Sequence, residues 1–172
     1  MTWCERAATI QAIILDVDGV LTDGRIGYGP DGSRVMFFHV RDGLAIRIAL
    51  RARFLVGFLS GRADPAMLAR AKELGVSFVY AGDADKAAAF QRLLREQSLE
   101  AEQCLYVGDD LPDLPAMRAA GIGVAVADAA AELREAADWV LESRGGHGAA
   151  RELIERLLRE RDLWQHATAD WL

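Results

Sequence analysis

Cysteine is scarce in this chain of 172 residues: its two cysteines, Cys4 and Cys104, form neither a metal-ligand pattern nor a disulfide framework. Such usage favours a reducing compartment, and the first residues lack the basic start and apolar block of a secretory signal. We therefore expect a cytoplasmic protein. No apolar run approaches the roughly 18 residues that a membrane-spanning helix needs, so we expect no membrane partner.

Blocks of basic residues are also absent. The net charge of −6 is spread along the chain, which argues against a nucleic-acid partner. The sequence shows no internal repeat, low-complexity tract or linker, and its 52% hydrophobic residues are ample for one sizeable core. Residues 1–172 are therefore predicted to form a single domain.

Apolar runs alternate with helical patterns along the whole chain. Because the runs are continuous, they are typical of parallel strands covered on both faces. The predicted strands are residues 12–17, 54–60, 76–82, 103–109, 122–128 and 138–141. The predicted helices are residues 42–53, 64–75, 83–97, 111–121, 128–137 and 150–164. This order of elements predicts an α/β fold, a three-layer Rossmann-like sandwich around a central parallel sheet.

Two segments depart from this alternation. Pro30-Asp31-Gly32 lies between two strand-like runs, which predicts a protruding β-hairpin at about residues 25–40. After a glycine-rich break, a C-terminal helix and tail occupy about residues 147–172. We expect the tail from Gln165 onward to fray, with Trp164 and Trp171 free to dock on a partner chain.

Charged and hydroxyl side chains follow four of the predicted strands. In chain order these are Asp16 and Asp18, Ser60 and Arg62, Lys86, and then Asp109, Asp110 and Asp113. Each alone also suits a structural role, such as a helix cap, a turn or a solvated helix residue. Together they should converge, because ligands gather beyond the carboxyl ends of parallel strands. Clustered carboxylates repel one another unless a cation intervenes, and a ligand set made of oxygens suits Mg²⁺.

Four segments in this order resemble the signatures of the haloacid dehalogenase-type phosphatase superfamily. They are DVDGV at 16–20, LSGR at 59–62, Lys86, and GDDLPD at 108–113. The resemblance implies that Asp16 is a nucleophile that forms an aspartyl-phosphate and that Asp18 is the general acid and base. Ser60 and Lys86 would hold the phosphoryl oxygens.

The same resemblance implies a Mg²⁺ site. Its ligands would be Asp16, the backbone carbonyl of Asp18, and Asp109, supported by Asp110 and Asp113. A carboxylate attacks a dianionic phosphate poorly because the two repel, and Mg²⁺ with Lys86 would cancel that repulsion. A response-regulator receiver also combines acidic residues, Ser/Thr and Lys, but there the acidic pair comes early in the chain, whereas here it comes last.

The gaps between the signatures leave no room for a cap domain, so we expect the hairpin and a neighbouring subunit to close the site. The chain resembles the cap-less subfamily of 3-deoxy-D-manno-octulosonate 8-phosphate phosphatases, which implies a homotetramer and a small sugar acid phosphate as substrate. Arginine forks suit its carboxylate and phosphate. The implied substrate-binding residues are Asp18, His39, Val40, Arg41, Asp42, Gly43, Arg47, Arg62, Arg70 and Lys86.

Two residues depart from the subfamily pattern. Ser60 replaces a common threonine but keeps the hydroxyl, whereas His39 stands where asparagine is frequent and leaves the sugar preference open. The alternatives are a nine-carbon ulosonate 9-phosphate, a broad phosphatase, or a non-catalytic oligomeric partner subunit of the same fold. An eight-carbon substrate would imply lipopolysaccharide biosynthesis. The glycine-rich segment GGHGAARE, residues 145–152, is expected to close a neighbour's site through its flexibility.

Overall fold

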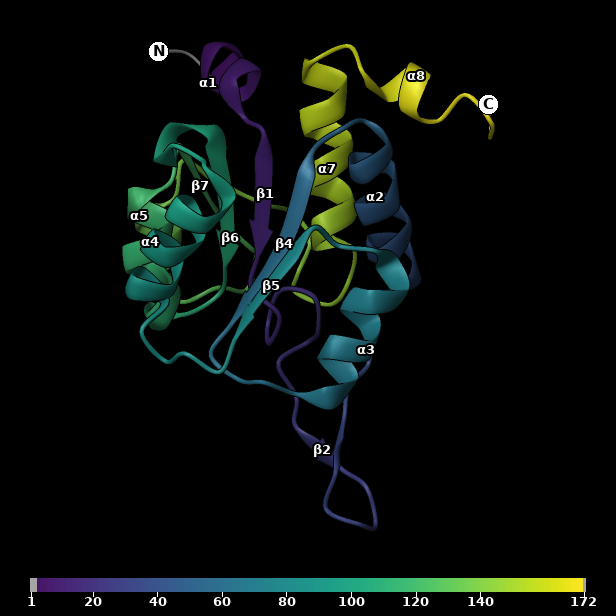
Figure 1. The fold of residues 1–172 in the computed structure, drawn as a ribbon, viewed down its shortest axis with the longest axis vertical. Helices are drawn as coiled ribbons and strands as arrows, with labels where there is room; N and C mark the ends of the chain where they lie inside the picture. Colours follow the sequence, from purple (N-terminus) through teal and green to yellow (C-terminus); the bar gives the residue numbers. More distant parts are fainter. Residues whose placement is uncertain (1–2, 172) are drawn as a thin grey trace.

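The apolar runs become the strands of one six-stranded parallel sheet, as predicted (Figure 1). The computed structural model describes residues 3–171. The strands lie in the order β5-β4-β1-β6-β7-β8. Their bounds are β1 Ala12–Leu15, β4 Leu55–Ser60, β5 Phe78–Ala81, β6 Cys104–Gly108, β7 Ile122–Ala125 and β8 Trp139–Val140. Every residue of β1, β6 and β7 is buried, which explains why these strands read as continuous apolar runs.

Helices cover both faces of the sheet and complete the three layers. Figure 1 shows α2, α3 and α7 on one face and α4 and α5 on the other. The helices are α2 Val40–Arg51, α3 Pro65–Leu74, α4 Lys86–Gln97, α5 Leu114–Ala119, α6 Ala131–Ala136 and α7 Ala149–Glu160, with 3₁₀ turns at Ala101–Gln103 and Leu111–Asp113. Asp64 and Asp85 cap α3 and α4 by accepting hydrogen bonds from the backbone N–H groups of Ala66 and Ala88. No helix within residues 3–171 is long and apolar enough to cross a membrane.

The predicted hairpin projects beyond the carboxyl ends of the strands (Figure 1). It consists of β2 Gly27–Tyr28 and β3 Arg34–Val35, paired antiparallel with Tyr28 opposite Arg34. The predicted range of about 25–40 is slightly too long, because α2 already begins at Val40. The part of the chain that the structure describes contains no separate cap domain.

Two short helices differ from the sequence prediction. Helix α1, Trp3–Thr9, was not expected; its Arg6 forms a two-pronged ion pair with Asp138 at 2.7 Å. At the other end, the expectation of a frayed tail is wrong. Helix α8, Trp164–Ala167, packs on its own chain, and Trp164 is buried rather than free to dock on a partner.

The tail is held by its own aromatic and polar contacts. The guanidinium groups of Arg151 and Arg159 lie 5.0 and 5.1 Å from the ring centre of Trp164. The hydroxyl group of Thr168 is buried and donates a hydrogen bond of 2.7 Å to the Trp164 carbonyl. Trp171 is more exposed and lies under the guanidinium of Arg51. Both ends of the described chain lie at the end of the molecule opposite the hairpin (Figure 1).

Candidate active site

The ends of β1, β4 and β6 and the start of α4 surround a cavity of about 460 Å³. All eight residues predicted from the strand ends line it: Asp16, Asp18, Ser60, Arg62, Lys86, Asp109, Asp110 and Asp113. Their convergence follows from the parallel sheet, because every strand delivers its carboxyl end to the same edge. Their individual roles stay predictions.

The loop after β1 is wound tightly so that two acidic side chains enter the cavity. The N–H of Asp16 continues the sheet by donating to the carbonyl of Val107 at 3.0 Å. The carbonyl of Val17 then accepts hydrogen bonds from Leu21 and Thr22. At Gly19 the backbone has a φ of +90°, and a Cβ atom there would overlap the carboxylate of Asp109. Glycine is therefore required where this loop approaches the end of β6.

Lys86 bridges two buried carboxylates. Its Nζ lies 2.7 Å from Asp16 Oδ1 and 2.5 Å from Asp113 Oδ1. Asp113 is held further by the hydroxyl of Tyr106, which donates at 2.6 Å, and by the backbone N–H of Asp109 at 3.2 Å. These charge-assisted hydrogen bonds hold the ammonium group beside Asp16. Tyr106 was not singled out from the sequence, since it sits within an apolar strand pattern.

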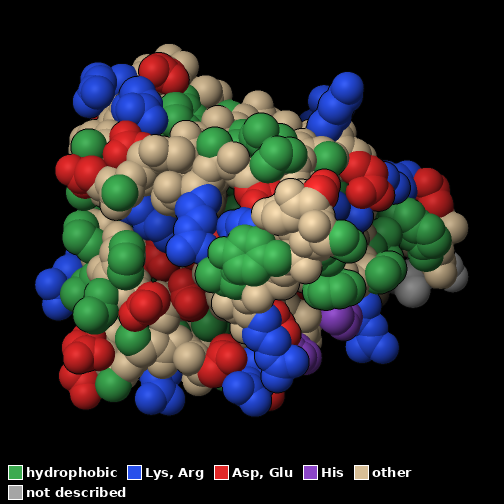
Figure 2. Space-filling model, turned by 90° about the horizontal axis from the view of Figure 1, so that it is seen from below, with side chains coloured by type: hydrophobic (Ala, Val, Ile, Leu, Met, Phe, Trp, Pro, Cys, Tyr) green, Lys and Arg blue, Asp and Glu red, His purple; other side chains and the backbone are tan. Residues whose placement is uncertain are grey.

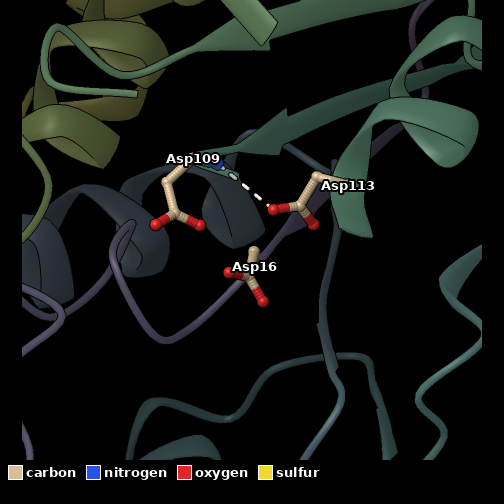
Figure 3. Close-up of side chains that lie close together, drawn as sticks. All are labelled: Asp16, Asp109 and Asp113. Carbon is tan, nitrogen blue, oxygen red and sulfur yellow. Dashed lines mark hydrogen bonds between the residues drawn. The ribbon is translucent and has the colours of Figure 1, made fainter. Parts of the chain in front are cut away.

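Three carboxylate side chains that line this cavity lie close together (Figure 3). Oxygens of Asp16, Asp109 and Asp113 all lie within 4.8 Å of one another. Burial and the charge of Asp113 raise the pKa of Asp109 to about 7 and raise that of Asp16 well above its ordinary value. Burial also acts to lower the pKa of Lys86, but the charges of Asp16 and Asp113 outweigh it and the pKa is raised. The site thus has an excess of negative charge that a cation would relieve.

Asp18 lies nearer the mouth of the cavity and faces two guanidinium groups. Nη2 of Arg34 donates a hydrogen bond of 2.9 Å to Asp18 Oδ1. Nη1 of Arg34 lies 3.4 Å from Asp64, and Arg62 Nη1 lies 3.7 Å from the other oxygen of Asp18. The sequence did not indicate Arg34 as a site residue, because an arginine in a hairpin is usually exposed to solvent.

The remaining predicted substrate residues do not line this cavity within one chain. They are His39, Val40, Arg41, Asp42, Gly43, Arg47 and Arg70, of which four line a separate small cavity between α2 and α3. Asp42 is buried and accepts hydrogen bonds from the backbone N–H groups of Gly148 and Arg151, at 3.3 and 2.8 Å. It thus holds the start of α7, a structural task that the sequence did not indicate.

The arginines of this second group are engaged with neighbouring residues. Arg70 pairs with Glu73 at 2.9 Å and lies 5.8 Å from the ring centre of Phe38. A Cβ atom at Gly43 would overlap the guanidinium of Arg70. Arg47 is exposed and donates a hydrogen bond of 3.2 Å to the carbonyl of Glu73. Assignment of this group to the substrate stays a prediction.

The glycine-rich segment 145–148 supports the loop after β1 of its own chain. The N–H of Gly146 donates to the carbonyl of Val20 at 2.9 Å, and a Cβ atom at Gly145 would overlap the carbonyl of Gly19. Its expected role in closing a neighbour's site stays a prediction.

Apolar side chains lie beside the cavity on the projecting hairpin. Figure 2, which looks onto this end of the molecule, shows hydrophobic side chains gathered next to a hollow with acidic and basic groups. The exposed apolar residues here are Ile26, Tyr28, Val35, Phe37 and Val40, of which Phe37 and Val40 are 78% and 81% exposed. Such a patch is typical of an interaction surface.

Sequence comparison finds relatives along almost the whole chain. The family profile of haloacid dehalogenase-like hydrolases matches residues 61–153. The 3-deoxy-D-manno-octulosonate 8-phosphate phosphatase of Haemophilus influenzae is 41% identical over 155 residues, which cover 90% of this chain and 86% of that protein. The corresponding Yersinia pestis protein is 40% identical over 164 residues, covering 95% and 88%.

Solved structures agree with this similarity. The 3-deoxy-D-manno-octulosonate 8-phosphate phosphatase from Moraxella catarrhalis, in complex with magnesium, phosphate and KDO, has a TM-score of 0.94 at 34% identity and covers 98% of this chain and 97% of that one. The cobalt-bound form of the Haemophilus influenzae phosphatase has a TM-score of 0.89 at 40% identity, covering 92% and 93%. The similarity therefore concerns the whole fold and not a single motif.

Proposed function

The chain belongs to the haloacid dehalogenase-like hydrolase family and is a phosphoric monoester hydrolase, and from this premise we propose that its substrate is 3-deoxy-D-manno-octulosonate 8-phosphate. The products would be the free sugar acid and phosphate, as part of lipopolysaccharide biosynthesis in the cytoplasm. The observation that carries the proposal is the ion pair of Asp16 with Lys86 at 2.7 Å inside a cavity that Asp18 and Ser60 also line. A nucleophile, a cation for phosphate and a proton donor are thus all available.

The carboxylates of this cavity fit a Mg²⁺ ion. We infer that Asp16, Asp109 and the main-chain carbonyl of Asp18 would hold it, with Asp110 and Asp113 in support. The oxygens of Asp16, Asp109 and Asp113 cluster within 4.8 Å, and their set is the hard oxygen type that Mg²⁺ prefers. When bound, the ion would reduce repulsion between nucleophile and phosphate and stabilise the charge of the transferred group.

In the first half of the reaction, an oxygen of Asp16 forms a bond to phosphorus while the bond from phosphorus to the sugar oxygen breaks. The bonding electron pair leaves with that oxygen, which takes a proton from Asp18, so that the sugar departs as an alcohol. Lys86 and the hydroxyl of Ser60 hold the phosphoryl oxygens and balance their charge. The result is an aspartyl-phosphate on Asp16.

In the second half, water attacks the phosphorus of that intermediate. Asp18, now ionised, accepts a proton from the water as the new bond forms. The bond between phosphorus and the Asp16 oxygen breaks, which releases phosphate and restores the Asp16 carboxylate. One carboxylic acid therefore serves as acid and then as base, so the cycle ends with both aspartates in their starting state.

We propose that the working form is a homotetramer. Within residues 3–171 no cap domain covers the cavity, and Phe37 and Val40 at the same end are 78% and 81% exposed. Arg62 lines the cavity of its own chain, whereas Arg47 and Arg70 do not. The second group of predicted substrate residues would therefore reach a substrate only across a contact between chains. Sedimentation equilibrium of the purified protein should give a mass four times that of one chain, and a monomer mass would reject the assembly.

A panel of phosphate esters tests the proposed activity. The eight-carbon sugar acid 8-phosphate should have the highest kcat/KM, EDTA should abolish turnover, and Asp16→Asn should have no measurable activity. Asp162→Asn is the matched control, since this carboxylate is exposed and lies after α7. Full activity of Asp16→Asn would refute covalent catalysis, and a higher kcat/KM for a nine-carbon 9-phosphate would move the assignment to that substrate.

A further inference from the structure

The carboxyl group of Asp18 is held in a different way from the other acids of the cavity. Asp113 receives hydrogen bonds from Lys86, Tyr106 and the backbone, and Asp16 contacts Lys86. Among the residues that the structure describes, the hydrogen bond to the carboxylate of Asp18 comes from Arg34, at 2.9 Å. The group proposed to move the proton is thus oriented from the hairpin and not from its own loop.

Arg34 also forms an ion pair on its other side. Its side chain is 16% exposed, and its Nη1 lies 3.4 Å from the carboxylate of Asp64. Asp64 is buried and accepts a hydrogen bond of 2.9 Å from the N–H of Ala66, at the start of α3. A chain of contacts therefore runs from the end of a packed helix through one guanidinium group to Asp18. The guanidinium group of arginine suits this task because it can donate a hydrogen bond to Asp18 while it forms an ion pair with Asp64.

The second guanidinium beside Asp18 is less able to orient it. Nη1 of Arg62 is 3.7 Å from the nearer oxygen, beyond hydrogen-bond distance, and its side chain is 57% exposed. Arg62 also lines the cavity and is available to a substrate anion, whereas Arg34 is engaged by two carboxylates. The two arginines thus have different tasks.

We infer that Arg34 is a positioning residue that holds the Asp18 carboxyl group in the direction needed for proton transfer to the leaving group. This inference rests on the proposed function, in which Asp18 is the general acid. Since Arg34 lies in β3, the hairpin contributes to catalysis within its own chain. The apolar side chains of the hairpin are exposed to solvent, whereas the side chain of Arg34 contacts Asp18 in the site.

Two substrates with different leaving groups separate this role from a general structural one. A sugar alkoxide needs a proton to depart, whereas 4-nitrophenolate leaves without one. The measured quantity is kcat/KM, because it reports the steps up to the departure of the alcohol and not the later hydrolysis of the intermediate. For Arg34→Ala we expect a loss of about 100-fold with 3-deoxy-D-manno-octulosonate 8-phosphate, the lower range of general-acid contributions, and little loss with 4-nitrophenyl phosphate.

Three variants make the test specific. Arg25→Ala is the matched control, because Arg25 precedes the hairpin, is 90% exposed and lies beside Asp23. Arg34→Lys should recover part of the sugar phosphate activity, since an ammonium group keeps the positive charge but lacks the planar guanidinium fork that faces both Asp18 and Asp64. Asp64→Ser keeps a helix cap but removes the anchor of Arg34, so it should show the same substrate-selective loss in smaller degree.

Added guanidinium ion gives a check that needs no further variant. It should restore sugar phosphate turnover in Arg34→Ala and leave the wild-type rate unchanged. Equal losses with both substrates, or no loss with either, would overturn the role of Arg34 while the phosphatase activity of the wild type stands. A wild-type protein that hydrolyses neither ester would instead overturn the proposed function, and this inference with it.

Discussion

Replacing Lys86 by methionine would remove the one positive charge between two buried carboxylates while keeping most of the side-chain volume. The Nζ atom lies 2.7 Å from Asp16 and 2.5 Å from Asp113, and the three side chains are 9%, 4% and 1% exposed. Removing one partner of a buried ion pair costs about 3–5 kcal/mol, because the remaining charges lose their compensation. For Lys86→Met in the metal-free protein at pH 8, we expect the free energy of unfolding to fall by about 3 kcal/mol, the lower end of this range.

The loss in the free energy of unfolding caused by Lys86→Met should be smaller at acid pH, because fewer of the neighbouring carboxyl groups are then ionised. Burial raises the pKa of Asp16 and Asp109 above the ordinary value of 3.8, so the folded state binds more protons than the unfolded chain. Their ionisation therefore destabilises the folded protein as the pH rises through the folded pKa. At pH 8 the Lys86→Met variant lacks the ammonium group that offsets this charge, whereas at pH 5 the carboxyl group of Asp109, whose pKa is about 7, is largely protonated. At pH 5 we therefore expect the free energy of unfolding to fall by only about 1 kcal/mol.

Thermal unfolding of the metal-free protein measures this difference. At pH 8 the loss corresponds to a fall in Tm of about 6–12 °C for a domain of this size, and at pH 5 to about 2–4 °C. The matched control is Lys72→Met, since Lys72 is the other lysine of the chain and lies exposed on α3. A fall of equal size at both pH values, or one no larger than that of Lys72→Met, would refute the electrostatic reasoning.

Two further predictions concern metal binding and stability. In the proposed magnesium site the carboxylate of Asp109 must be ionised to bind the ion, and its pKa is raised to about 7. The Kd for Mg²⁺ should therefore increase about fivefold from pH 7 to pH 6 in a calorimetric titration, and a constant Kd would contradict this. Asp42→Ala should lower the free energy of unfolding in urea by about 1–3 kcal/mol, because the N–H groups of Gly148 and Arg151 lose their acceptor. Asp42→Asn keeps one acceptor oxygen and should lose less, so equal losses would argue against the capping role.

The elements that sequence reasoning found are those with strong local signals. Strand β1 is buried throughout and is correspondingly a continuous apolar run, while α3 and α4 begin at the aspartates Asp64 and Asp85 that cap them. Such signals act over a few neighbouring residues and need no knowledge of the rest of the chain. The same holds for the site, because polar residues just after parallel strands must share one edge.

The elements that it missed are short and depend on distant partners. Helices α1 and α8 have seven and four residues, too few to be stable alone. Helix α1 is held by the ion pair of Arg6 with Asp138, and α8 by Trp164 beneath two arginines of α7. Neither contact can be predicted from the local sequence pattern, because each joins residues that are not neighbours in the sequence.

The sequence by itself determined the layered fold and the acidic residues at the strand ends, because periodicity and strand order act through local rules. Only the tertiary structure decided how those residues are supported. Arg34 reaches Asp18 because the hairpin folds back, and Gly145 packs on the loop at Gly19, far away along the chain. Such contacts depend on the path of the backbone between the two partners, and that path is set by the packed core as a whole.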